Sequence, residues 1–188
     1  PHLVETFRTL WLQTSFRHIL SAFCVGFFFN MGVSQWLATF LIRSHGMTPI
    51  EVGVWLALSF GVFGTLGICL GGYCASRFAA CKEKLQMRVL SCTSICYGFA
   101  SLVIYLSPNK YTVITFIAIS ALVGPFGNGP IFAAMQSLVN EKMRSVAVAI
   151  TFMFANLIGF GLGPLALGAI SDLLNPIFGQ DSLRYALA

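Results

Sequence analysis

The sequence of 188 residues predicts an all-α membrane protein: five transmembrane helices plus the start of a sixth, from one six-helix lobe. Hydrophobic residues make up 57% of the chain and charged residues only 9%, whereas a soluble domain contains about 25% charged residues. The apolar residues form five long stretches, and most charges lie in the short gaps between them. A stretch of about 20 apolar residues matches the ~30 Å thickness of a bilayer core.

The five predicted spans cover residues 19–42, 52–75, 89–106, 111–138 and 146–174. Trp36, near one end of the first span, is expected to anchor at the membrane interface. Before the second span, Thr48, Pro49 and Glu51 form the pattern of a capping box with proline at the first helical position. Glycines and prolines at 124–130 are expected to interrupt the backbone hydrogen bonds of the helix in the fourth span. Residues 181–188 turn apolar, as a sixth helix would at its start.

Basic residues divide unequally between the two ends of the spans. Eight lie on one side and three on the other: Arg8, Arg17, Arg77, Lys82, Lys84, Arg88, Lys142 and Arg144, against Arg43, Lys110 and Arg184. The positive-inside rule places the side with eight in the cytoplasm. This placement accounts for the net charge of +5 without a nucleic acid partner.

The predicted topology divides the chain into three parts. We expect a cytoplasmic linker at 1–18, the five helices of the lobe at 19–174, and an external loop with the start of a truncated last helix at 175–188. The first residue is proline rather than methionine. We therefore expect a piece of a longer protein, integral to the membrane and crossing it several times, and in the inner (plasma) membrane if the source is bacterial.

Two pairs of glycines hint at an internal repeat. Gly67 and Gly72 in the second span match Gly163 and Gly168 in the fifth, at a spacing of 96 residues. These spans run in opposite directions, which fits an inverted three-plus-three repeat, a hallmark of secondary transporters. Glycines also let helix backbones approach closely in a bilayer. These glycines either pack the helices tightly in one arrangement or let the helices slide or bend, and the sequence leaves both roles open.

Polar residues inside the spans are the candidates for contact with a solute. The cavity candidates are Asn30, Ser34, Phe126, Asn128 and Asn156, and the helix-bending candidates are Pro125, Pro130, Gly163 and Pro164. Asn30 and Ser34 are four residues apart and share a helical face. Polar groups in a span point away from lipid, so these side chains either line a cavity or form hydrogen bonds between helices. Asn128 either lines a cavity or satisfies a backbone group that Pro130 leaves free.

Sequence motifs for catalysis are missing. All six acidic residues lie near span ends or in gaps, and no P-loop, HExxH or GxSxG motif is present. The six cysteines show no CxxC and no metal-ligand spacing with histidine. We therefore expect no enzyme activity, no cofactor and no bound metal. A proton-driven carrier would need its intramembrane carboxylate outside this chain.

Several stretches resemble a known transporter family. The segment from Gly72 to Arg77 resembles the cytoplasmic loop motif Gly-x-x-x-Asp-Arg of the major facilitator superfamily, although Ser76 replaces the aspartate. Stretches within 136–172, together with 182–187, resemble bacterial members of its spinster-like subgroup. The resemblance implies the C-terminal half of a carrier, with the first and fourth spans lining the cavity. It also implies that Gly72 and Arg77, together with Arg144, belong to a cytoplasmic gate, although Arg144 also fits a simple topology signal.

The resemblance implies a secondary carrier, a symporter or antiporter that moves a small organic or lipid-like solute by alternating access, with proton coupling. Its partners would be the lipid bilayer and a missing N-terminal six-helix lobe of the same transporter. A structural or accessory membrane subunit that transports nothing is the alternative, because glycine faces serve packing equally well. The broken fourth span favours the carrier.

Overall fold

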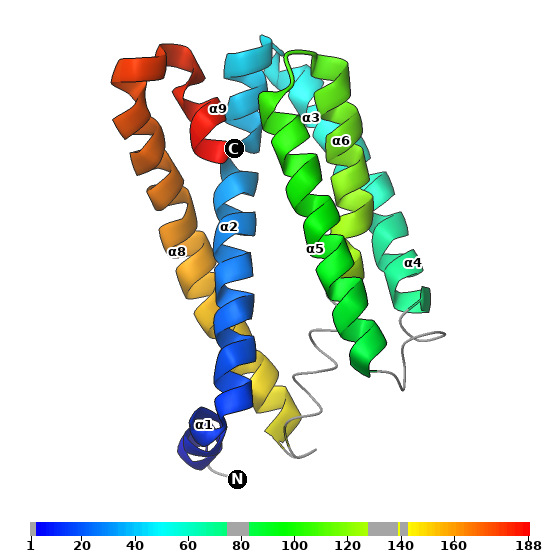
Figure 1. The fold of residues 1–188 in the computed structure, drawn as a ribbon, viewed down its shortest axis with the longest axis vertical. Coiled ribbons are helices and arrows are strands. Elements are labelled where there is room, and N and C mark those ends of the chain that lie inside the picture. Colours follow the sequence, from blue (N-terminus) through cyan, green and yellow to red (C-terminus); the bar gives the residue numbers. More distant parts are fainter. Residues whose placement is uncertain (1–2, 75–82, 128–138, 140–142) are drawn as a thin grey trace. The chain divides into compact units, whose positions relative to one another are not determined.

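The computed structural model describes residues 3–74, 83–127, 139 and 143–188, and the regular elements in these residues are all helical (Figure 1). In chain order they are α1 (Leu3–Leu12), α2 (Thr14–His45), α3 (Pro49–Ala57), η1 (Leu58–Gly64), α4 (Thr65–Cys74), α5 (Glu83–Leu106), α6 (Lys110–Val123), η3 (Gly124–Gly127), α8 (Arg144–Phe178), η5 (Gly179–Asp181) and α9 (Ser182–Leu187). The chain forms two compact units, which are described separately below.

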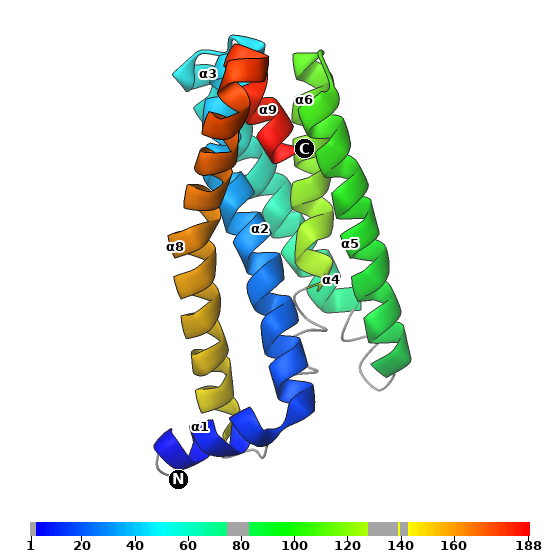
Figure 2. The same cartoon turned by 60° about the vertical axis from the view of Figure 1, so that its left-hand side comes forward.

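The first unit comprises Pro1–Trp36 and Ile131–Ala169. Its long helices α2 and α8 lie side by side in both Figure 1 and Figure 2. Every fourth residue of α8 is buried, and most of these residues are small: Ala147, Thr151, Ala155, Gly159, Gly163 and Leu167. Residues four apart form a ridge along a helix, and small side chains on that ridge let two helices approach closely.

At one end of this unit, α1 turns away from the direction of α2 (Figure 2). Leu10 is buried in a cluster with Phe16, Leu20 and Ala147, so α1 is docked by its apolar face rather than loosely attached. The ring of Trp11 stacks on Phe7 and also contacts Phe154 of α8. The expected linker at 1–18 therefore contains α1 and the first residues of α2.

Trp36, which the sequence predicts to be an interfacial anchor, contacts a second helix in the structure. Its ring is partly buried against α8, where its Nε1 donates a hydrogen bond to the carbonyl oxygen of Pro164 at 2.9 Å. A Cβ added at Gly168 would lie 3.1 Å from the same ring. The indole thus packs between helices because a glycine leaves room for it and a carbonyl accepts from it.

The second unit comprises Leu37–Pro130 and Ile170–Ala188. Helix α6 packs against α5 on one side and against η1 and α4 on the other. Its buried residues are all apolar: Val113, Ile114, Ile117 and Ala121. Near the end of α5, the buried ring of Tyr105 packs edge-on against Phe40 of α2, with ring centroids 5.2 Å apart.

The predicted second span is one run of helix whose middle differs from its ends. Thr48 caps α3, and the capping box is complete: Glu51 Oε2 accepts from the Thr48 backbone N–H at 2.9 Å. The next segment, η1, is a π-helix, a geometry that the sequence analysis did not anticipate. Just after it, the Thr65 hydroxyl donates to the carbonyl oxygen of Gly61.

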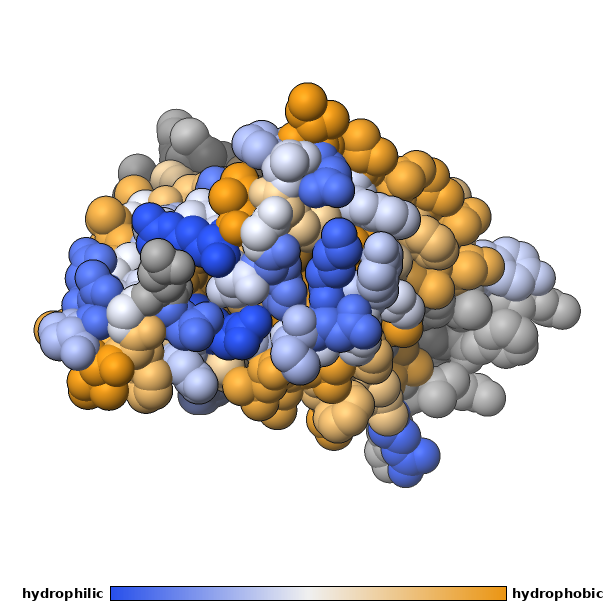
Figure 3. Space-filling view, turned by 90° about the horizontal axis from the view of Figure 1, so that it is seen from above, coloured by the Kyte–Doolittle hydropathy of each residue, from blue (hydrophilic) through white to orange (hydrophobic). Residues whose placement is uncertain are grey.

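The apolar helices are suited to lipid. Among the described residues, three helices are long and apolar enough to cross a membrane: Thr14–His45, Pro49–Tyr73 and Arg144–Phe178. Two shorter apolar helices are Ser91–Leu106 and Lys110–Val123. Many large apolar side chains on them are exposed. Figure 3 looks onto the end that carries the α2–α3 and α5–α6 connections, where hydrophilic side chains gather with hydrophobic ones around them.

Candidate functional site

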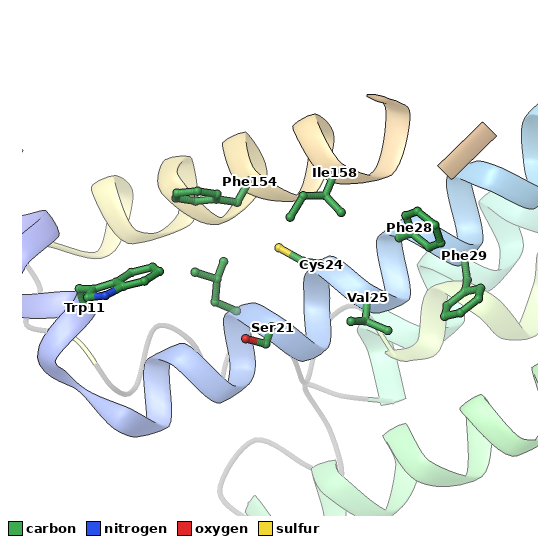
Figure 4. A pocket seen from close by; sticks show the side chains of 9 residues that line it. Trp11, Ser21, Cys24, Val25, Phe28, Phe29, Phe154 and Ile158 are labelled. Carbon is green, nitrogen blue, oxygen red and sulfur yellow. The ribbon is translucent and has the colours of Figure 1, made fainter. Parts of the chain in front are cut away.

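An apolar groove of about 600 Å³ lies in the first unit, between α1, α2 and α8. Its lining is almost entirely apolar or aromatic: Trp11, Leu20, Ser21, Cys24, Val25, Phe28, Phe29, Phe154 and Ile158. Figure 4 shows Trp11 at one end and Phe28 and Phe29 at the other, with Cys24 between them. A groove of this composition accommodates apolar atoms and offers few groups that orient a polar ligand.

The predicted cavity residues of α2 and α8 are exposed and do not line the groove. Ser34 Oγ donates to the carbonyl oxygen of Met31 at 3.2 Å, and Asn156 Nδ2 donates to that of Phe152 at 2.7 Å. Both bonds stay within one helix. Asn30 is exposed on α2, on the same side as Ser34.

Other predicted site residues lie at helix ends or outside the described residues. Arg144 is the exposed first residue of α8. A Cβ added at Gly72, near the end of α4, would meet no atom within 4 Å. The residues outside the described part are Arg77, Asn128 and Pro130.

In the fourth predicted span, the backbone changes from α-helix to 3-10 helix at the first Gly-Pro pair, Gly124 and Pro125. Helix α6 ends at Val123, and Gly124–Gly127, which includes Pro125 and Phe126, forms a 3-10 helix. In contrast, α8 stays helical through Gly163 and Pro164. The bending role of these two residues stays a prediction.

Glycines place helix backbones in close contact in each of the two units. In the second unit, a methyl group at Gly67 of α4 would overlap the carbonyl oxygen of Leu122 of α6. In the first unit, a Cβ at Gly163 of α8 would lie 2.6 Å from the Phe28 carbonyl oxygen and 3.0 Å from the Gly32 nitrogen of α2. Gly67 and Gly163 are one of the two glycine pairs that the sequence repeats.

Within the residues that the structure describes, no group of three histidine, cysteine, aspartate or glutamate side chains could hold a metal ion.

The family follows from a comparison with known sequences. The model of the Major Facilitator Superfamily matches residues 1–171, which is most of the chain. The chain belongs to the Major Facilitator Superfamily. It is thus an integral membrane protein of a transporter family rather than of an enzyme family, and the superfamily resemblance read from the sequence is confirmed.

A curated relative is an MFS-type efflux pump of Mycolicibacterium smegmatis, which is 31% identical over 148 residues. The match covers 79% of this chain and 34% of the pump, so the chain spans about a third of that relative's length.

The fold resembles that of solved structures of a bacterial homolog to the human lysosomal transporter Spinster. The inward-facing, unoccupied structure matches with a TM-score of 0.75 and 21% identity, over 92% of this chain and 36% of that one. The inward-facing, occupied structure matches with a TM-score of 0.76 and 18% identity, over 95% of this chain and 46% of that one. At such identities the likeness concerns the fold alone.

The sequence analysis missed the groove and the Trp36–Pro164 bond. The groove combines α1 and α2 with α8, which lies far from both in the sequence, and each helix contributes apolar residues of ordinary type. The bond joins residues 128 positions apart. The aromatic residues along 7–29 were the available signal for the groove, but generic membrane packing has the same composition.

Proposed function

We propose that this chain is part of a secondary active transporter that moves a small organic or amphiphilic solute by alternating access, with proton coupling. The family match over residues 1–171 carries the proposal. The printed name of the mycobacterial relative, an efflux pump, supports solute transport as the activity. The plasma membrane is the proposed location for a bacterial source.

The proposed architecture is five transmembrane helices plus the start of a sixth, at 19–174 and 175–188, built as an inverted three-plus-three repeat. The glycine contacts support it. The second predicted span touches the fourth through Gly67, and the fifth touches the first through Gly163. Two repeats related by a two-fold axis should make such contacts in both directions. The second helix of each half then packs on the first helix of the other half.

The proposed partner is a second six-helix lobe of the same transporter. The matched relatives are two to three times longer than this chain, which leaves room for such a lobe. The solute cavity would lie between the lobes, lined by Asn30, Ser34, Phe126, Asn128 and Asn156. The exposure of Asn30, Ser34 and Asn156 supports this, because a buried cluster would have no access to a solute.

The gate and the hinges are proposed at helix ends. Arg77 with Gly72, and Arg144 at the start of α8, would close the cytoplasmic side, and Pro125, Pro130, Gly163 and Pro164 would let helices bend. The 3-10 geometry at Gly124–Gly127 supports bending in the fourth span. For the solute, the aromatic groove supports an amphiphile, because its apolar walls would bind an apolar tail.

Uptake into proteoliposomes tests the function. The complete transporter that contains this sequence, reconstituted with a trapped pH-sensitive dye, is challenged with a panel of amphiphilic organic ions. We expect at least one member to drive saturable proton movement, and we expect none to do so with the 188-residue chain alone. Saturable transport by the chain alone would show that a second lobe is unnecessary. No response from the complete protein to any solute would contradict proton-coupled transport.

A further inference from the structure

A polar corner lies at one end of the second unit, where α2 stops. Gly46 adopts the left-handed conformation, with φ of +62°, and its N–H donates to the carbonyl oxygen of Ile42 at 3.1 Å. This is the glycine C-cap geometry, so His45 is the last helical residue. The His45 ring is held edge-on against Phe40, with centroids 5.2 Å apart. Phe40 is itself fixed by Tyr105, so the imidazole has a defined position.

Helix α9 brings a cation to the same corner. The chain turns at Gly179, which has a φ of +55°, and α9 follows. The Ser182 and Ser171 hydroxyls lie 3.3 Å apart and are both buried, and Leu183 is fully buried. Helix α9 also packs on α5, and the fully buried Leu183 precedes Arg184 in the chain, so the backbone at Arg184 is held in place. The guanidinium is then close enough to His45 for the two groups to interact electrostatically.

Three polar atoms at this corner are buried without a hydrogen-bond partner in the part of the chain that the structure describes. They are Ser44 Oγ, His45 Nε2 and Arg184 Nε. Native proteins pair nearly all such groups, so each exception calls for an explanation. The arginine is decisive, because a guanidinium only donates and does not lose its proton. Asp172 and Asp181, the acidic residues of the adjoining segment, are both exposed.

We propose that Ser44, His45 and Arg184 form a binding site for a carboxylate. The Arg184 Nε–H can only donate and has no acceptor, and a carboxylate only accepts, through two oxygen atoms. An arginine binds it with two parallel N–H groups, one of which is Nε–H, while the serine hydroxyl and the imidazole add donors of ordinary strength. The partial negative charge at the end of α2 opposes an anion, but it is smaller than the full charge of Arg184 and falls off within one turn.

The corner lies near the surface of this unit, because Arg43 and Gly46, which flank Ser44 and His45 in the chain, are exposed and hydrophilic side chains gather on this end of the molecule (Figure 3). Two sources of a carboxylate fit this geometry. One is a small organic anion from solution. The other is an aspartate or glutamate side chain from a part of the transporter outside this chain. Both present the same group to Arg184, so the experiment has one arm for each.

The test measures thermal stability in phosphatidylcholine nanodiscs, with sodium acetate as the probe and sodium chloride at equal ionic strength as the reference. For the 188-residue chain we expect a saturable rise of the melting temperature in acetate over chloride. Arg184→Lys, which keeps the charge but lacks the planar fork, and His45→Gln should lose most of this rise. Arg43→Gln removes a cation from the same end of α2 outside the site and should keep it.

The second arm repeats the titration on the complete transporter. A rise that persists there identifies the source as a free organic anion, and a rise confined to the 188-residue chain identifies a side chain that already fills the site. An equal rise in Arg184→Lys, or an equal effect of chloride, would overturn the proposal. So would the lack of any acetate effect on both proteins.

Discussion

Gly67 is the residue whose substitution most directly probes helix packing in the second unit. A Cβ at this position would overlap the backbone of Leu122, and a backbone yields less easily than a side chain. Gly67→Ala should therefore destabilise the folded chain by roughly 1–3 kcal/mol, the usual range for overpacking. Melting curves in detergent measure the change.

Gly53 provides the matched control for Gly67. It lies in α3, in the same predicted span, and a Cβ there would meet nothing within 4 Å. Gly53→Ala should leave the melting temperature unchanged or raise it, because alanine favours helix by up to about 1 kcal/mol over glycine. Equal destabilisation by both variants would mean that α4 and α6 do not meet at Gly67.

Asn30 probes the proposed solute cavity. It is exposed on α2, so its loss should affect a bound solute more than the fold. In the complete transporter, Asn30→Ala should raise the KM roughly two- to tenfold, as the loss of one hydrogen bond worth about 0.5–1.5 kcal/mol would do. The same is expected of Asn128→Ala. Transport kinetics paired with melting curves make the measurement.

Two results separate a solute contact from a contact between helices at Asn30 and Asn128. A lowered melting temperature with unchanged KM at both positions would remove them from the cavity. Ser101→Ala serves as control, because the Ser101 hydroxyl bonds to the carbonyl oxygen of Gly98 within α5, outside the proposed cavity.

At the scale of elements, the start of α3 depends on the Thr48 cap. Thr48 Oγ1 accepts from the Glu51 N–H at 3.3 Å, and Glu51 returns the bond to the Thr48 backbone. Thr48→Ala should cost about 1 kcal/mol, the usual worth of an N-cap, and should speed amide hydrogen exchange in the first turn of α3. Thr48→Ser keeps a hydroxyl and should exchange like the wild type. If the two variants exchange alike, the cap contributes nothing to the start of α3.

The sequence predicted the helices α2, α5 and α8 and the start of α3 well, because these depend on local information. It did not predict α1, and the end of the fourth span lies outside the described residues. Apolar runs define spans by length, and a capping box needs only four consecutive residues. The observed helices extend a few residues beyond the predicted spans, as α2 does from Thr14 to His45. The charged and polar residues at those ends are helical too, but they lie outside the apolar run from which the span was predicted.

The features that sequence reasoning missed depend on long-range contacts or on geometry without a sequence signature. The π-helix Leu58–Gly64 has the composition of an ordinary span. Trp36 resembled an interfacial anchor because its acceptor, Pro164, lies in another helix. Predicted site residues such as Asn128 and Arg77 lie outside the described residues, so they stay predictions.

At the scale of the whole molecule, the chain contains apolar helices and a reciprocal pair of glycine contacts, and it spans about a third of the length of the efflux pump that it matches. A carrier differs from a static membrane subunit in one respect: its cavity opens to one side of the membrane and then to the other. Asn30 is suited to report it, because the residue is exposed and lies in the middle of α2.

Accessibility of position 30 from each side of the membrane is the most direct test. Asn30→Cys is placed in a cysteine-free complete transporter and labelled with an impermeant maleimide in right-side-out and inside-out vesicles. Alternating access predicts labelling from both sides. As references, a cysteine at Lys110 should react only from outside, one at Lys84 only from the cytoplasm, and one at the fully buried Thr151 from neither. Labelling of position 30 from one side only, or from neither, would contradict the account.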